Sequence, residues 1–168
     1  MDRGILPLDL EPVDLEALIA ATIEAAVLPA DRSVTVEVEP VEAVVDGSKV
    51  ERILENLLMN AVRHTGADVP IWVRARAADE GLLLIVEDAG PGVAPEDRAG
   101  LFEPFRQGHD AATRGAGAGI GLSLVSRFAE MHGGRAWVDE RPGGGASFKV
   151  LLPGGARTSD DRSAAWPA

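Results

Sequence analysis

Residues 48–65, SKVERILENLLMNAVRHT, restrict the fold of this chain most, because they predict one long helix with two unlike faces. One face is apolar, with residues recurring at intervals of three and four: Val50, Ile53, Leu54, Leu57, Leu58, Ala61 and Val62. That spacing is typical of a helical face that is buried against another layer of the protein.

The opposite face of this predicted helix carries Arg52, Asn56, Asn60 and Arg63, and the two asparagines lie one turn apart. Asparagine is unfavourable inside a helix because its amide competes with the backbone for hydrogen bonds. Two interpretations stay open from the residues alone. The face is simply solvated, or its amide oxygens hold a hard cation while Arg63 meets the phosphates that the cation accompanies.

The rest of the chain contains further predicted helices and several predicted strands. A helix is predicted from Val13 to Pro29, with Asp14 as its cap and a core-facing stripe of Leu15, Leu18, Ile19, Ile23, Ala26 and Val27. A short turn of helix follows Pro95, and a further helix spans 119–132. Strands are predicted at 33–39, 41–46, 71–77, 82–87, 135–139 and 146–152, and the alternating Leu6, Leu8 and Leu10 suggest a short additional strand.

Two predicted turns, at residues 79–81 and 142–145, join strands as hairpins. Because hairpins follow hairpins, the sequence excludes a doubly wound parallel sheet. It predicts an α/β (α+β) two-layer sandwich, in which a mixed, largely antiparallel sheet packs against about three helices. Residues 1–9 are expected to be an N-terminal arm or the remnant of a linker, 10–153 a single domain, and 154–168 a disordered tail.

The formal net charge of −11 argues against a nucleic-acid partner and against contact with an anionic membrane. An anionic nucleotide is compatible with this charge only through locally placed donors and a metal ion. The sequence contains no cysteine, no apolar run near the ~20 residues of a membrane span and no signal-peptide pattern at its start. A cytoplasmic location is therefore expected.

Three further segments are candidates for chemistry. Residues 88–92, DAGPG, place Asp88 at the end of a buried strand, where the segment is an ordinary Asp-Gly turn or a carboxylate that needs a ligand donor such as a purine amino group. Residues 115–121, GAGAGIG, open a helix and are a flexible linker or a nest of N–H groups for a triphosphate. Phe102 and Phe105, in a predicted mobile loop, either pin that loop to the core or anchor a hinge.

The order and spacing of these segments resemble the ATP-binding catalytic domain of bacterial sensor histidine kinases, in the GHKL ATPase superfamily. Asn-x-x-x-Asn on a helix matches the N box, and Asp-x-Gly-x-Gly after a strand matches the G1 box. Leu-Phe-x-x-Phe matches the F box, and Gly-x-Gly-x-Gly-Leu opening a helix matches the G2 box. The resemblance covers roughly residues 10–153.

The resemblance implies a site for ATP and Mg²⁺. Asn60 would coordinate Mg²⁺ with Asn56 close to the same ion, and Arg63 would lie near the phosphates with His64 against the nucleotide. Asp88 would bind the adenine amino group. The other implied ATP-binding residues are Gly90, Gly92, Val93, Phe105, Arg106, Gly117, Gly119, Ile120, Gly121 and Leu122, and residues 102–116 would form a mobile ATP lid.

The sequence departs from the family pattern at three positions. Ala89 replaces the asparagine that commonly follows the G1 aspartate, and Pro104 replaces the arginine of the commoner F box, for which Arg106 or Arg114 would have to substitute. Ala118 lacks the side-chain hydrogen bond of the polar residue often found there.

The residue at position 56 separates two kinds of activity within the superfamily. Members that hydrolyse ATP place a glutamate four residues before the metal-binding asparagine, whereas this chain has Asn56 there. An amide cannot accept a proton at neutral pH, so the sequence predicts phosphoryl transfer rather than efficient hydrolysis.

The acceptor is predicted to lie outside this chain, since neither His64, His109 nor His132 stands in the histidine-kinase acceptor motif. The expected partners are ATP, the acceptor-helix domain of the same kinase and, downstream, a response regulator, and the expectation allows a membrane anchor elsewhere in the parent kinase. The histidine-kinase interpretation is favoured by residues 8–19, LDLEPVDLEALI, which look like the usual exit from acceptor helices. The alternatives are an anti-sigma-factor-type serine kinase and a non-catalytic nucleotide-sensing module.

Overall fold

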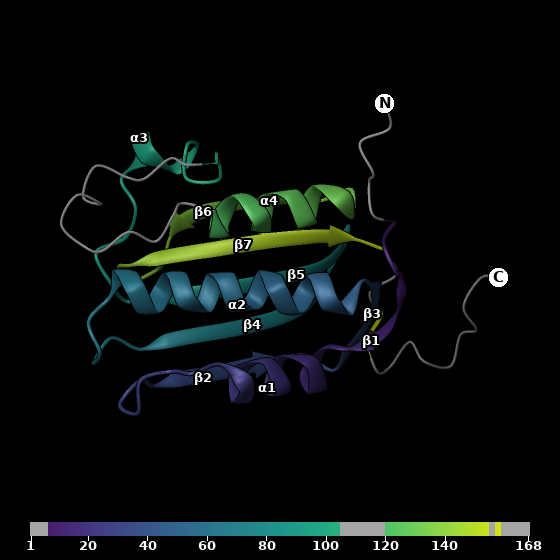
Figure 1. Cartoon of the computed structure of the whole chain (residues 1–168), viewed down its shortest axis with the longest axis horizontal. Coiled ribbons are helices and arrows are strands. Elements are labelled where there is room, and N and C mark those ends of the chain that lie inside the picture. Colours follow the sequence, from purple (N-terminus) through teal and green to yellow (C-terminus); the bar gives the residue numbers. More distant parts are fainter. Residues whose placement is uncertain (1–6, 105–119, 155–156, 159–168) are drawn as a thin grey trace.

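The computed structural model describes residues 7–104, 120–154 and, as backbone alone, 157–158. Its main sheet has five strands in the order β2 (Val34–Val38), β4 (Ile71–Ala78), β5 (Gly81–Asp88), β7 (Ala146–Pro153) and β6 (Arg135–Glu140). Three helices cover one face of this sheet: α1 (Leu15–Ala25), α2 (Gly47–His64) and α4 (Gly121–Met131) (Figure 1). One further turn, α3 (Pro95–Arg98), follows β5.

The sheet is mixed, as the sequence predicts. The pairs β4–β5, β5–β7 and β6–β7 are antiparallel, and only β2 pairs in parallel, with β4. The two predicted hairpins are present, and Gly81 in the first has φ +147°. Strand β5 is central and buried along its whole length, which explains its continuous apolar sequence. The predicted two-layer sandwich is confirmed.

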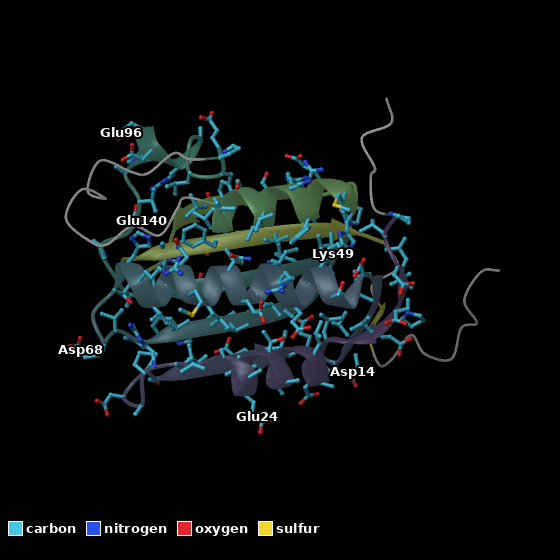
Figure 2. All side chains as sticks on the ribbon, viewed as in Figure 1. Asp14, Glu24, Lys49, Asp68, Glu96 and Glu140 are labelled. Carbon is cyan, nitrogen blue, oxygen red and sulfur yellow. The ribbon has the colours of Figure 1, made fainter. Side chains whose placement is uncertain are left out.

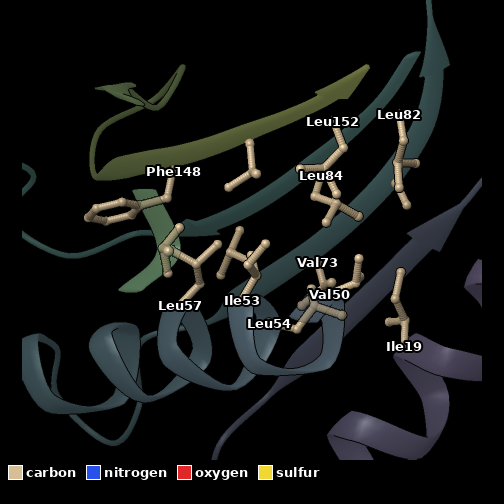
Figure 3. Close-up of a cluster of buried hydrophobic side chains, with 14 of the residues drawn as sticks. Ile19, Val50, Ile53, Leu54, Leu57, Val73, Leu82, Leu84, Phe148 and Leu152 are labelled. Atoms are coloured by element: carbon tan, nitrogen blue, oxygen red, sulfur yellow. The ribbon is translucent and has the colours of Figure 1, made fainter. Parts of the chain in front are cut away.

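Helix α2 lies across the centre of the sheet and supplies much of the core. Its buried residues are Val50, Ile53, Leu54, Leu57, Leu58 and Ala61. Figure 3 shows Ile53, Leu54 and Leu57 pointing towards Leu84 of β5 and Phe148 of β7. The helix starts where the Asp46 carboxylate accepts the N–H of Lys49, so a polar cap fixes its first turn. The predicted apolar face of this helix is confirmed.

Three expectations differ from the structure at its margins. The N-terminal strand is β1 (Glu11–Asp14), which pairs with β3 (Val41–Val45), and not the segment of alternating leucines. Together with β8 (Arg157–Thr158), which falls in the segment expected to be a disordered tail, these strands form a second, three-stranded sheet. Val27 is 93% exposed, since α1 ends at Ala25 and the helical stripe stops there.

Within the described residues, no helix combines the length and apolar character needed to cross a membrane.

Candidate functional site

Asp88 is the last residue of β5 and is 4% exposed. Its Oδ1 accepts the N–H of Gly90 at 2.9 Å. Burial raises the pKa of this carboxyl, while the N–H groups of Gly90 and Ala146 and the charges of His64 and Arg32 act in the opposite direction. A carboxylate that burial disfavours gains from any further donor, so Asp88 is suited to bind an amino group.

The turn after Asp88 brings three segments into close approach, and glycine is required at two of the contact points. A Cβ on Gly90 would lie 2.6 Å from Cγ2 of Thr65 and 2.8 Å from Oδ1 of Asp88. A Cβ on Gly145, which has φ +112°, would lie 1.9 Å from the Asp88 carbonyl oxygen. The loop after β5, the end of α2 and the start of β7 therefore meet around Asp88.

Asn56 brings the polar face of α2 against the beginning of α4. Its Nδ2 donates to the Arg52 carbonyl at 2.7 Å, which leaves the side-chain oxygen directed away from its own helix. That oxygen would lie 2.8 Å from a Cβ placed on Gly121, the first residue of α4. Asn56 and Gly121, predicted from separate motifs, are thus neighbours.

The same face of α2 continues from Asn56 to Asp88. Asn60 is half-buried one turn further on, and Arg63 and His64 are exposed in the last turn. His64 acts electrostatically on Asp88. The stretch of α2 from Asn56 to His64 is about 12 Å long along the helix axis, and it has α4 at its Asn56 end and Asp88 at its His64 end. Asn60 lies between those ends.

The C-terminal end of α2 lies at one end of the molecule. Figure 2 shows Asp68, in the loop after α2, and Glu140, at the end of β6, on that side, whereas Lys49 of the first turn of α2 lies towards the other. The predicted residues of the N and G1 boxes and the start of α4 therefore surround one region rather than opposite surfaces.

The remaining predicted residues divide into two groups. Val93 and Leu122 pack against the core, Gly92 has φ +76°, and Ile120 is 43% exposed next to Gly121. Phe105, Arg106, Gly117 and Gly119, with most of the predicted lid, lie outside the described residues. Phe102 is described and packs edge-on against Phe148 at 6.4 Å between ring centres, as the core-pinned interpretation of the F-box loop requires.

Sequence reasoning missed two residues of this region, Arg32 and Thr65. Arg32 precedes β2 and is 9% exposed, and its Nη1 donates to Thr65 Oγ1 at 2.7 Å. No periodicity or motif marks an arginine at the start of a strand as buried, and its partner is 33 residues away.

A surface hollow of about 390 Å³ lies elsewhere, between α3, α4 and β6, and is lined by Arg98, Phe102, Ser126 and Trp137 among others. None of the predicted ATP-binding residues lines it. The candidate site is therefore the region around Asp88 and the polar face of α2 rather than this hollow.

The described residues contain no cluster of three or more His, Cys, Asp or Glu side chains suited to a metal ion. A divalent ion at this site would instead depend on the amide oxygens of α2 together with oxygens of its ligand. That donor set fits Mg²⁺, which commonly takes few protein ligands and completes its shell with phosphate and water.

Comparison with known proteins places this geometry in a wider group. Residues 45–156 match the family described as histidine kinase-, DNA gyrase B-, and HSP90-like ATPase. The alginate biosynthesis sensor protein KinB of Pseudomonas aeruginosa is 40% identical over 108 residues, which are 64% of this chain and 18% of KinB. The chain spans less than a third of the length of the curated relatives it matches.

Two solved structures are similar over most of the chain. A mycobacterial sensor histidine kinase, MprB, has a TM-score of 0.75 at 30% identity and covers 86% of this chain and 97% of its own. Full-length ShkA in complex with AMPPNP has a TM-score of 0.73 at 31% identity and covers 92% of this chain and 33% of its own.

Proposed function

The chain belongs to the histidine kinase-, DNA gyrase B-, and HSP90-like ATPase family, and from that premise we propose that it binds ATP with Mg²⁺ and donates the γ-phosphoryl group to a histidine on another domain. Of the relatives named above, KinB is a sensor protein, MprB is a sensor histidine kinase, and ShkA was solved with AMPPNP. The finer proposal is that this chain is the phosphoryl-donating half of such a kinase.

The observation that carries the proposal is the convergence of Asp88, the polar face of α2 and the first turn of α4. Asp88 supplies a buried acceptor for the adenine amino group. The N-terminus of α4 presents main-chain N–H groups and the positive end of the helix dipole to phosphate oxygens. Asn60 and Asn56 would hold Mg²⁺ between these two points, and the ion would neutralise charge on the phosphates.

Asn56 favours transfer over hydrolysis. Its Nδ2 is committed to the Arg52 carbonyl, and its oxygen belongs to an amide, which takes no proton from water at neutral pH. Transfer to a separate nucleophile needs positioning and charge neutralisation from this chain and no base of its own.

A described histidine also supports an acceptor elsewhere. His132 has both ring nitrogens engaged: Nε2 accepts the N–H of Asp46 at 3.1 Å, and Nδ1 lies 2.7 Å from the Phe128 carbonyl. His64 lies beside Asp88 in the proposed nucleotide site. The partners proposed are an acceptor-helix domain of the same kinase and a response regulator that receives the phosphoryl group from it.

The test is transfer of label from [γ-³²P]ATP to a separately produced acceptor-helix domain of the parent kinase. We expect labelled acceptor whose phosphate is released by acid and retained in alkali, as for phosphohistidine. Acid-stable label would instead identify a serine kinase of the anti-sigma-factor type. ATP binding without any transfer would identify a nucleotide-sensing module.

The metal assignment has its own test, an Asn60→Ala variant titrated calorimetrically with ATP in the presence and absence of Mg²⁺. We expect the wild-type affinity to rise with Mg²⁺ and the affinity of the variant to be the same in both buffers. Arg52→Gln is the control, because Arg52 is an exposed side chain of the same helix that pairs with Glu55. Mg²⁺ dependence that survives in Asn60→Ala would remove Asn60 as the ligand.

A further inference from the structure

Arg32 is a buried cation that closes the C-terminal end of α2. Its Nη1 donates to the Val69 carbonyl at 2.8 Å as well as to Thr65 Oγ1, and its Nη2 donates to the carbonyls of Val62 and Thr65 at 3.4 and 3.3 Å. The last carbonyls of a helix lack partners within the helix, so this guanidinium performs the role that a glycine-based cap usually performs. No motif of the proposed function includes it.

Thr65 connects this cap to the base-binding end of the site. Its Oγ1 accepts from Arg32 and donates to the Ala61 carbonyl at 2.6 Å, so the side chain is held by a bond on each side. Its methyl carbon Cγ2 would lie only 2.6 Å from a Cβ on Gly90, which means that it rests against that glycine. Gly90 in turn donates its N–H to Asp88.

We propose that Arg32 is a positioning residue for base recognition, which locks Thr65 against the Gly90 turn and thereby fixes Asp88 for the amino group of the purine. The inference rests on the proposed function and deepens it, since it assigns the selectivity for adenine partly to a residue that does not touch the nucleotide.

Charge acts in the same direction as the contacts. Burial raises the pKa of Asp88, and the positive charges of Arg32 and His64 lower it, so Arg32 favours the ionised form that accepts from an amino group. The Arg32 Nε is buried and makes no hydrogen bond to any described residue, so the contacts of the guanidinium with the end of α2 are made by Nη1 and Nη2.

A purely structural cap and a positioning residue make different predictions. A cap alone would change the stability of α2 and leave the discrimination between bases unaltered. A positioning residue would weaken the binding of ATP, whose amino group meets Asp88, more than the binding of GTP, which presents an oxo group there. The informative quantity is therefore the ratio of GTP to ATP dissociation constants.

The experiment measures ATP and GTP affinity by calorimetry and unfolding by heat for wild type, Arg32→Met, Arg32→Lys, Thr65→Val and Thr65→Ser. We expect the selectivity ratio to fall at least fivefold in Arg32→Met and to a smaller extent in Arg32→Lys, which keeps the charge but loses the forked donors. In Thr65→Val, which loses the hydroxyl but keeps Cγ2, the selectivity ratio should fall at least threefold. In Thr65→Ser, which keeps both hydroxyl bonds but loses the Cγ2 that rests against Gly90, the ratio should also fall at least threefold.

Ile19→Val is the control for lost stability, because Ile19 is fully buried in α1 and belongs to no part of the site. It should lower the melting temperature and leave the ratio unchanged. An unchanged ratio in Arg32→Met and in Thr65→Val, with ATP still bound, would overturn the inference while leaving the proposed function intact. If Arg32→Met does not fold, the result for Thr65→Val decides. If wild type binds no ATP, the proposed function itself is wrong.

Discussion

At the scale of single residues, the site depends on a carboxylate that is buried, where its ionised form is disfavoured. Asp88 lies at the point where an otherwise apolar strand ends, and strand alternation puts it on the same face as Leu84 and Val86. Burial there is unfavourable for folding and favourable for recognition, because a ligand donor replaces part of the lost hydration.

The first prediction concerns Asp88→Asn, which removes the charge and keeps the shape. A hydrogen bond to a charged group contributes about 1.5–3 kcal/mol, so ATP affinity measured by calorimetry should fall about tenfold to a hundredfold. The melting temperature at pH 7.5 should stay equal or rise, since burial raises the pKa of the native carboxyl and its ionised form is disfavoured in the folded state.

The pH dependence follows with a definite sign. In wild type, Asp88 makes the free energy of unfolding fall as pH rises from its unfolded pKa near 3.8 through its raised folded pKa, because the folded state resists losing the proton. The Asn variant should lack that part of the slope. A variant that melts much lower and binds ATP as before would make Asp88 a structural residue.

At the scale of secondary-structure elements, two adjacent glycines between α4 and β6 show different reasons for their conformation. Gly133 has φ +78° and open space where a Cβ would point. Gly134 has no positive φ, yet its Cβ would lie 1.8 Å from the Leu151 carbonyl oxygen of β7. Gly133 is therefore favoured by its backbone conformation, and Gly134 by the close approach of two strands.

The second prediction compares Gly133→Ala with Gly134→Ala in urea unfolding. The first change should cost about 1–2 kcal/mol, the strain of a left-handed conformation in an L-residue. Gly134→Ala should cost clearly more, because its methyl can be accommodated only by separating β6 from β7. Equal costs would show that the hairpin shifts easily, and the proposed tight register would then be wrong.

At the scale of the whole molecule, Asp46 connects parts that are distant in sequence. Its carboxylate caps α2 and accepts from Ser48 and from the N–H of Asp9, which precedes β1. Its own N–H donates to His132 at the end of α4. The N-terminal segment, the central helix and the last helix thus share one buried residue at the end of the molecule away from Asp88.

The third prediction is the acid sensitivity of this junction. Burial alone would raise the pKa of Asp46, but hydrogen bonds from Ser48, Asp9 and Lys49 and the charge of Lys49 outweigh it and lower the pKa from its ordinary value of 3.8 to about 2. A lowered folded pKa contributes stability above the unfolded value, here about 2 kcal/mol, which is lost as pH falls from about 4 to about 2.

Acid unfolding followed by circular dichroism should show this contribution directly. Asp46→Asn should be less stable than wild type at pH 7, and the difference should shrink towards pH 2. Glu42→Gln is a suitable control, because Glu42 lies in the neighbouring strand β3. This substitution also removes one negative charge, but Glu42 caps no helix. A stability difference for Asp46→Asn that is constant over this pH range would contradict the assignment.

The sequence by itself determined the local elements and the identity of the motifs. The three-and-four spacing of α2, the continuous apolar run of β5 and the glycine turns of both hairpins are properties of neighbouring residues, so they can be recognised without any knowledge of the fold. The order of the four boxes is likewise a property of the chain alone, and it indicates the family without reference to the fold.

Tertiary structure alone decided which distant residues meet. The parallel pairing of β2 with β4, the separate sheet of β1, β3 and β8, and the position of Arg32 on Thr65 all join residues whose separation leaves no periodic signal in the chain. Such contacts depend on how whole elements pack, and packing follows from the summed burial of many side chains rather than from any one local pattern.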